Sequence, residues 1–274
     1  MTGDENRADV EFGFREEWEH FSRGNPKFLK YFDNLVKTSE IAFEERVALT
    51  RTVDSAVLVL GRLCLEDFFE ILLLCGNGYG IGGQKLVRGM YEKAVTARYL
   101  HTNPELVYDF LDYFWISQHK LSEAIKQTFG ADAIPPNRLQ ETTTKYQSLK
   151  ERFQIAECDK CKTTRTNHTW SKLDFVSMAT ECGTLGQLIV PAYYLPMQEA
   201  HTTVGSLLNR LQAKSDNSLE FNPGPQREIA KDALMSAHNI MLNVLELQEE
   251  HFNKNDLEEP LRICRRDFVD IWAV

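Results

Sequence analysis

The stretch that decides the fold is RVALTRTVDSAVLVLGRLCLEDFFEILLLC, residues 46–75. Its apolar side chains recur at spacings of three and four residues, which is the period of an α-helix. Examples are Val57, Leu60, Cys64, Phe68 and Leu72. Because apolar residues occupy most of its circumference, we expect this helix to be largely buried and to end at Gly76.

Similar signals extend in both directions along the chain. Asn25-Pro26 and Asn103-Pro104 each combine a capping residue with proline, which is typical of a helix start. The sequence predicts an all-α fold, a single multi-helix bundle-like domain of about eight or nine helices. The other predicted helices cover residues 27–43, 105–129, 137–156, 171–179, 185–211 (bent or restarted at Pro191 and Pro196) and 226–252.

This pattern predicts the domain boundaries as well. Residues 1–24 are a polar segment with a short helix, residues 25–255 form the helical domain, and residues 256–274 are a C-terminal tail. Within the domain, residues 130–170 are less regular and are expected to be an insertion. We find no internal repeat.

The composition of the chain argues against some functional classes. The net charge is −9, which argues against extended DNA binding and against an anionic membrane surface, although a local basic groove is compatible with it. No secretory signal is recognisable near the first residue, and the longest apolar run, residues 68–75, is too short to span a bilayer. We therefore expect a cytoplasmic protein whose six cysteines are reduced.

A glycine run, GNGYGIGG at residues 76–83, satisfies the dinucleotide-binding pattern G-x-G-x-x-G. That pattern requires a preceding strand, and helices are predicted on both sides of the run. We interpret the glycines as a helix–helix connection that permits a left-handed cap and a close approach between helices.

The next segment, LVRGMYEKAVTARYL at residues 86–100, is apolar but carries Arg88 and Glu92 four residues apart. On a helix the two side chains share one face at the margin of the buried surface. If exposed, the pair is a modest ion pair; if buried, it is a better candidate for a positioned functional site.

The same segment resembles the helix motif of an uncharacterised bacterial all-helical family, classed only as a domain of unknown function. The similarity covers roughly residues 40–215 and includes the Arg-Gly-x-x-Glu helix, a later Trp and a Tyr-rich helix leading to a His. The resemblance implies Arg88, Glu92 and His201 as catalytic candidates. It implies Tyr91, Trp170 and Tyr193 as ligand-binding candidates.

The helical layout of that family is similar to the HEPN (higher eukaryotes and prokaryotes nucleotide-binding) group, which includes metal-independent ribonucleases of bacterial defence systems. Arg15 and His20 fit the Arg-x4–6-His spacing of that group, although about one such match is expected by chance. An Arg/Glu/His cluster could bind phosphate and exchange protons near neutral pH.

Metal sites are the remaining alternative. Cys158, Cys161, His168 and Cys182 are of the types that zinc accepts, but their spacing is irregular, and reduced cysteines are the preferred interpretation. A carboxylate di-metal site needs two Glu-x-x-His motifs, and the sequence has one, Glu17 to His20. We expect no cofactor.

Two functional hypotheses follow. The first is a helical interaction or sensor module without chemistry of its own, which binds a protein partner or forms a homo-oligomer. The alternative is a HEPN-like effector or toxin, a metal-independent ribonuclease that acts on RNA or a nucleotide through Arg88, Glu92 and His201.

Overall fold

Helices dominate the computed structural model of the chain and make up 80% of it, which confirms the all-α prediction. The structure describes residues 14, 16–44, 49–158, 163–201, 203–216 and 218–273. The chain divides into two compact units, residues 1–101 with 179–274, and residues 102–178. The predicted irregular stretch 130–170 lies inside the second unit, and the predicted domain boundaries stay predictions.

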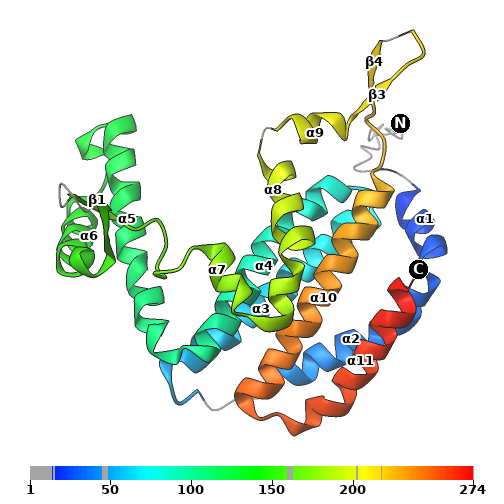
Figure 1. The fold of residues 1–274 in the computed structure, drawn as a ribbon, viewed down its shortest axis with the longest axis horizontal. Helices are drawn as coiled ribbons and strands as arrows, with labels where there is room; N and C mark the ends of the chain where they lie inside the picture. The colour runs from blue at the N-terminus through cyan, green and yellow to red at the C-terminus, as the bar shows by residue number, and fades with distance from the viewer. Residues whose placement is uncertain are drawn as a thin grey trace, which may run out of the picture. The chain divides into compact units, whose positions relative to one another are not determined.

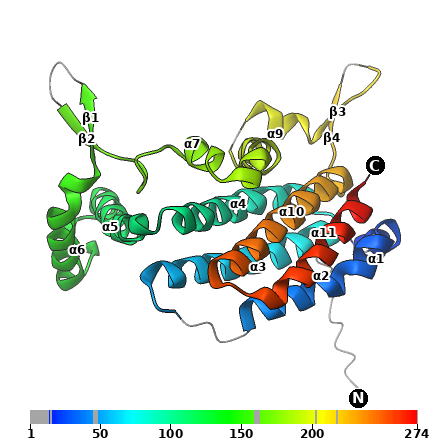
Figure 2. The same cartoon turned by 60° about the horizontal axis from the view of Figure 1, so that its bottom comes forward.

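The core of the first unit lies between two long helices, α3 (Thr52–Gly76) and α10 (Arg227–Phe252), which pack side by side (Figure 1). The helices α2 (Pro26–Glu44) and α11 (Glu258–Trp272) pack along each other and against α10 (Figure 2). The sequence predicted α3 from residue 46, but the helix begins at Thr52, and residues 45–48 lie outside the described part. The short α1 (Glu17–Gly24) precedes α2.

The predicted tail contributes to this core. Residues 255–257 form a 3₁₀ turn, and α11 then buries Leu261, Cys264 and Trp272 against α2 and α10. The Trp272 indole Nε1–H donates to Nδ1 of His238 at 3.1 Å. Burial, together with the charge of Arg265, lowers the pKa of the His238 imidazole to about 3, so the ring is a neutral acceptor within an aromatic core.

The glycine run connects α3 to α4 (Gly80–Thr102), as the sequence predicted. Gly78 has φ 79°, a left-handed conformation that favours glycine. Gly80 lies against α10: a Cβ added there would be 2.4 Å from the carbonyl oxygen of Gln226 and 2.5 Å from the amide nitrogen of Ala230. The glycine therefore allows the start of α4 to contact the backbone at the start of α10.

We predict that Gly80→Ala destabilises the protein by about 1–3 kcal/mol or more, because neither backbone atom can move away without disturbing α10. Gly82→Ala is the matched control. Its added Cβ would lie 3.5 Å from the nearest atom, a side-chain carbon of Leu74, and alanine favours a helix by up to about 1 kcal/mol. Urea unfolding followed by circular dichroism measures both variants, and equal effects would contradict the backbone-contact interpretation.

The sequence predicted one helix over residues 185–211, bent or restarted at Pro191 and Pro196, and the structure divides this segment into several short pieces. It consists of a 3₁₀ segment η4 (Gly183–Leu188), a π-helical turn η5 (Val190–Tyr194), α8 (Leu195–Ala200) and α9 (Val204–Leu208). In η5 the Leu195 amide donates to the carbonyl of Val190, five residues back. Pro191 and Pro196 supply no N–H, which favours such interruptions of the regular ladder.

Two short antiparallel hairpins were not predicted. One pairs β1 (Gln154–Cys158) with β2 (Thr163–Thr166) in the second unit, and the other pairs β3 (Leu211–Ala213) with β4 (Leu219–Phe221) in the first. Their strands are only three to five residues long, too short to show a two-residue period clearly.

The second unit is organised by two helices, α5 (Val107–Phe129) and α6 (Pro136–Leu149), which pack together. His119 of α5 stacks on Tyr146 of α6 with ring centroids 3.7 Å apart. Short 3₁₀ segments join the elements at residues 104–106, 131–133 and 150–153, and α7 (Phe175–Thr180) leads back to the first unit. Among the described helices, none has the length and apolar character needed to cross a membrane.

Candidate functional site

The helix α4 positions Arg88 and Glu92. One face of α4 is fully buried and includes Val87, Met90 and Tyr91, each 0% exposed. Arg88 and Glu92 lie at the edge of that face, with side chains 25% and 41% exposed. The pair is therefore partly buried and still accessible to solvent. This lies between the fully exposed pair and the buried pair that the sequence left open.

Arg88 is the centre of a polar cluster. Its Nε donates to Oε1 of Glu92 at 2.8 Å, and its Nη1 lies 3.3 Å from Nε2 of His201. The guanidinium also lies over the ring of Tyr193, 4.8 Å from the ring centre. The structure thus brings together Arg88, Glu92, His201 and Tyr193 from α4, η5 and the end of α8.

The hydrogen bond between Arg88 and His201 determines which ring nitrogen of His201 accepts. Arginine only donates hydrogen bonds, so the Nε2 atom of His201 accepts from Arg88 and the ring hydrogen is on Nδ1. Arg88 therefore donates hydrogen bonds to the two groups that could exchange protons, Glu92 and His201. An anion that binds the guanidinium would compete for these contacts and release both groups.

A hollow of about 370 Å³ opens beside the cluster. It is lined by two cationic side chains, Lys85 and Arg210, together with His201 and Glu199. Arg210 also donates to the carbonyls of Asn222 at 3.1 Å and Gly224 at 3.2 Å, which anchors the residues after β4. The local charge favours an anion despite the net charge of −9.

Two of the aromatic candidates make other contacts. Tyr91 is fully buried, and its hydroxyl donates to the carbonyl of Leu185 at 2.7 Å, so it is a core residue here instead of the expected ligand contact. Trp170 belongs to the second unit, where it makes an edge contact with Phe110 at 5.4 Å between ring centres.

The described residues include only part of the four candidate zinc ligands. Cys161 and the side chain of Cys158 lie outside the described residues, and His168 is exposed in the second unit. Cys182 is buried, its Sγ donates to the carbonyl of Val95 at 3.6 Å, and burial raises the pKa of its thiol to about 12. A thiol in that state is a poor zinc ligand, because the metal binds the thiolate.

A comparison with protein-family models matches residues 54–218, more than half of the chain, to a family of unknown function, DUF5677. This chain belongs to that family. The match confirms the expected resemblance to a family of unknown function. Comparisons with curated proteins and with solved structures found no match.

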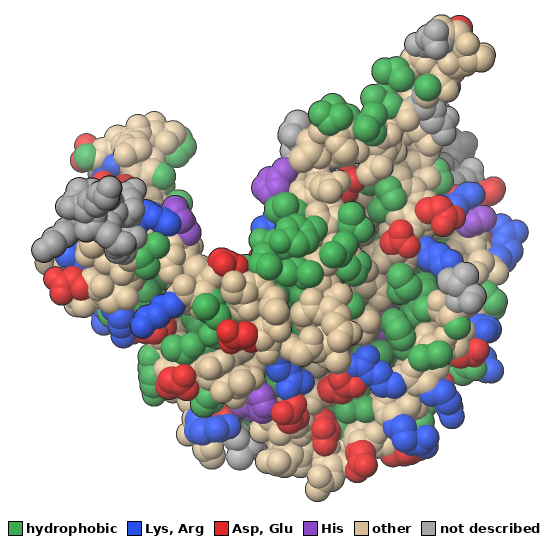
Figure 3. Space-filling view, viewed as in Figure 1, with side chains coloured by type: hydrophobic (Ala, Val, Ile, Leu, Met, Phe, Trp, Pro, Cys, Tyr) green, Lys and Arg blue, Asp and Glu red, His purple; other side chains and the backbone are tan. Residues whose placement is uncertain are grey.

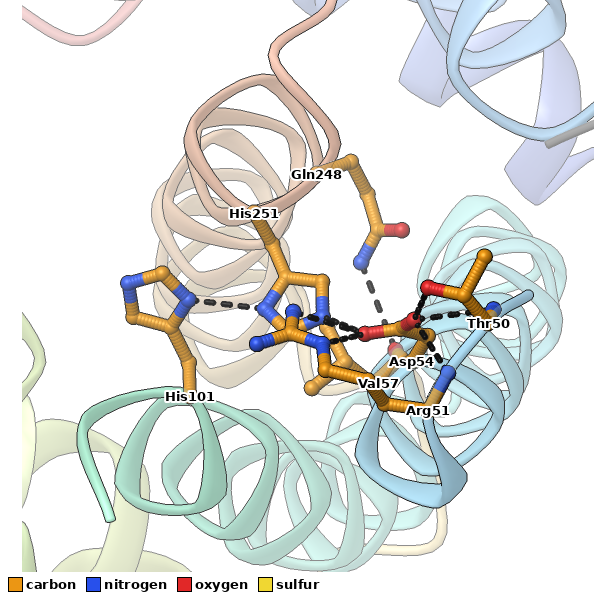
Figure 4. Close-up of polar contacts among 7 residues, drawn as sticks. All are labelled: Thr50, Arg51, Asp54, Val57, His101, Gln248 and His251. Carbon is orange, nitrogen blue, oxygen red and sulfur yellow. Dashed lines mark hydrogen bonds and ion pairs between the residues drawn. The ribbon is translucent and has the colours of Figure 1, made fainter. Parts of the chain in front are cut away.

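A second polar cluster in this family member was missed by sequence reasoning (Figure 4). Near the start of α3, Asp54 is 3% exposed, and its carboxylate accepts from Arg51 Nε at 2.9 Å. His251 of α10 contacts the same carboxylate through Nε2 at 3.1 Å, and its Nδ1 faces Nδ1 of His101 at 2.8 Å. His101 lies in the last turn of α4, and its Nε2 is 3.1 Å from Oε1 of the exposed Glu250.

The pKa values in this network follow from burial and hydrogen bonding. Burial alone would raise the pKa of the Asp54 carboxyl, but hydrogen bonds from Arg51 and His251 outweigh it and hold the pKa well below its usual range. Burial lowers the pKa of His251, partly opposed by Asp54. A neutral His251 donates from Nε2 to Asp54 and accepts at Nδ1 from His101.

The sequence held one signal for this cluster. Asp54 accepts from the Arg51 amide at 2.8 Å at the start of α3, a contact between residues three apart that spacing can reveal. Its partners His251 and His101 are far away in sequence, so no spacing indicates them.

We predict that the free energy of unfolding falls as the pH falls from 7 to 5. The folded-state pKa values of His238 and His251 are both lowered, so the unfolded chain binds more protons once the pH passes below about 6.5, and stability is lost there. Two such groups give a slope of up to about 2.7 kcal/mol per pH unit. Urea unfolding at several pH values measures it.

His251→Ala should roughly halve that slope and lower stability at pH 7 by about 1.5–3 kcal/mol, because Asp54 loses a charged hydrogen bond. His20→Ala, on the exposed side of α1, is the control for losing an imidazole from the surface. An unchanged slope in His251→Ala would contradict the role assigned to this ring.

Proposed function

We propose that this family member is a metal-independent ribonuclease whose active centre is the cluster around Arg88. The observation that supports the proposal is the convergence of Glu92, His201 and Tyr193 on one guanidinium beside an open cationic hollow. Arginine binds phosphate oxygens through two parallel N–H bonds, and the two flanking groups can each hold a proton. The proposal also includes a relationship to the HEPN group. Arg15, the arginine of the Arg-x4–6-His spacing, lies outside the described part of the chain.

The proposed reaction assigns one role to each residue. Arg88 binds the phosphodiester, and Glu92 accepts the proton of the ribose 2′-hydroxyl as its oxygen attacks phosphorus. The bond from phosphorus to the 5′-oxygen breaks, and this oxygen receives a proton from Nε2 of a protonated His201. The products are a 2′,3′-cyclic phosphate and a 5′-hydroxyl, and no metal or other reactant is consumed.

We predict that Arg88→Ala, Glu92→Gln and His201→Ala each reduce RNA cleavage by about 100-fold or more, since each removes a group needed for binding or proton transfer. The assay uses a labelled single-stranded RNA in the presence of EDTA and identifies the terminal groups of the products. Arg262→Ala is the matched control, because Arg262 forms a similar pair with Glu259 on the exposed side of α11. Equal cleavage by wild type and all variants would overturn the proposal.

An interaction module is a second candidate function, and a specific surface supports it. Apolar side chains of η5, α8 and α9 are between 39% and 70% exposed. In Figure 3 green side chains gather over this segment. Contiguous exposed apolar residues are typical of protein interfaces. The residues are Val190, Tyr194, Leu195, Val204, Leu207 and Leu208.

For this second candidate we predict that the chain self-associates through α9. The double variant Leu207→Asp with Leu208→Asp should be monomeric, because charges on an apolar interface are costly to bury. Val269→Asp, at a similarly exposed position on α11, is the control. Sedimentation velocity over a range of concentrations measures the state, and a wild-type monomer at every concentration would contradict the prediction.

A further inference from the structure

A second hollow, of about 450 Å³, shares the Glu199 side chain with the cationic hollow. Gln84 of α4 and Asp232 of α10 also line it, and Leu195, Ile229 and Met235 give it apolar walls. A pocket of this size, with apolar walls and a few polar groups, is typical of a site for a small ligand.

Two buried side chains of this hollow have hydrogen-bonding capacity left over. Glu199 is 9% exposed and Gln84 is 6% exposed. The Oε1 atom of Glu199 accepts from Nδ2 of Asn209, but no donor in the described part of the chain reaches its Oε2 atom or Oε1 of Gln84. Buried acceptors without donors are costly, so a ligand that supplies donors gains affinity here.

The charge of the hollow also favours a ligand that supplies hydrogen-bond donors. Its described lining residues include the carboxylates of Glu199 and Asp232 and no Lys, Arg or His. A group with an acceptor on its exposed edge would be repelled by these carboxylates. The hollow therefore favours a group that presents adjacent donors.

We propose that this hollow is the base-recognition site of the ribonuclease and that it binds guanine. Guanine presents two adjacent donors, N1–H and the N2 amine, which match a carboxylate. Adenine and cytosine place a ring acceptor beside their amine, and uracil flanks its N–H with two carbonyls. The two unpaired oxygens are buried, and the terminal torsions of Glu199 and Gln84 are soft, so these groups rotate toward the base as it binds.

The arrangement also explains how one ligand reaches both hollows. Glu199 and His201 are two residues apart at the end of α8, and His201 contacts Arg88 at 3.3 Å. A nucleotide with its base against Glu199 has its phosphate directed to the cationic hollow. This inference rests on the proposed function for the phosphate, while the base contacts are independent of Arg88.

Equilibrium titration of the full chain tests the proposal with guanosine 3′-monophosphate, adenosine 3′-monophosphate, guanosine and inorganic phosphate. We expect wild type to bind the guanine nucleotide at least tenfold more tightly than the adenine nucleotide. Glu199→Gln should abolish that preference without weakening phosphate binding, because the negative charge that it removes also lines the cationic hollow. Arg88→Ala should weaken both nucleotides and phosphate but leave guanosine binding unchanged.

Two further variants complete the test. Leu195→Trp, at a half-exposed position, fills the hollow and should remove guanosine binding even if Glu199→Gln fails to fold. Glu228→Gln is the control for loss of an exposed carboxylate. Equal affinity for guanine and adenine nucleotides overturns the base assignment alone. Guanosine binding that depends on Glu199, without phosphate binding, supports the base site and overturns the proposed ribonuclease.

Discussion

The buried carboxylate of Asp54 is the constraint on which much of the first unit depends. A carboxylate with 3% exposure must be surrounded by donors, because its desolvation is costly. Those donors come from the cap of α3 and from His251 near the end of α10, and His251 in turn contacts His101 at the end of α4. One charge therefore requires three helices to meet at the same end of the bundle.

The helix α4 is fixed at both ends, and this places the candidate site. At its start Gly80 contacts the backbone of α10, and at its end His101 joins the buried network. Arg88 and Glu92 lie between these two anchors, so their positions are set by the core. The partners that meet them, Tyr193 and His201, come from two short segments, η5 and the end of α8.

Much of the helical fold is predictable because its signals are local. The period of Val57, Cys64 and Phe68 predicts α3, and the glycine run predicts a connection with close helix contact. Arg88 and Glu92 are four residues apart, so their pairing is predictable as well. His201 entered only through a family resemblance, because 113 residues separate it from Arg88.

The features that the sequence did not reveal are those set by distant contacts. One example is the meeting of three helices at Asp54, His101 and His251. From sequence alone, a histidine on a helix is most simply interpreted as an exposed polar residue. The hairpin strands are short, and the π-helical turn breaks the very period on which helix prediction depends. Glu199 resembles an ordinary surface glutamate in sequence, although it is buried between two hollows.

The π-helical turn at Val190–Tyr194 accommodates one extra residue in the chain. Its i→i+5 bond closes a turn with five residues where an α-helix uses four, at nearly the same total rotation about the axis. Removal of one residue from this turn, with a return to regular α-helix, would therefore leave α8 close to its present orientation. Removal of one residue from α8 itself would rotate the residues that follow by about 100° and take His201 away from Arg88. The turn is thus a position where the length of the chain can vary while the contact between His201 and Arg88 is kept.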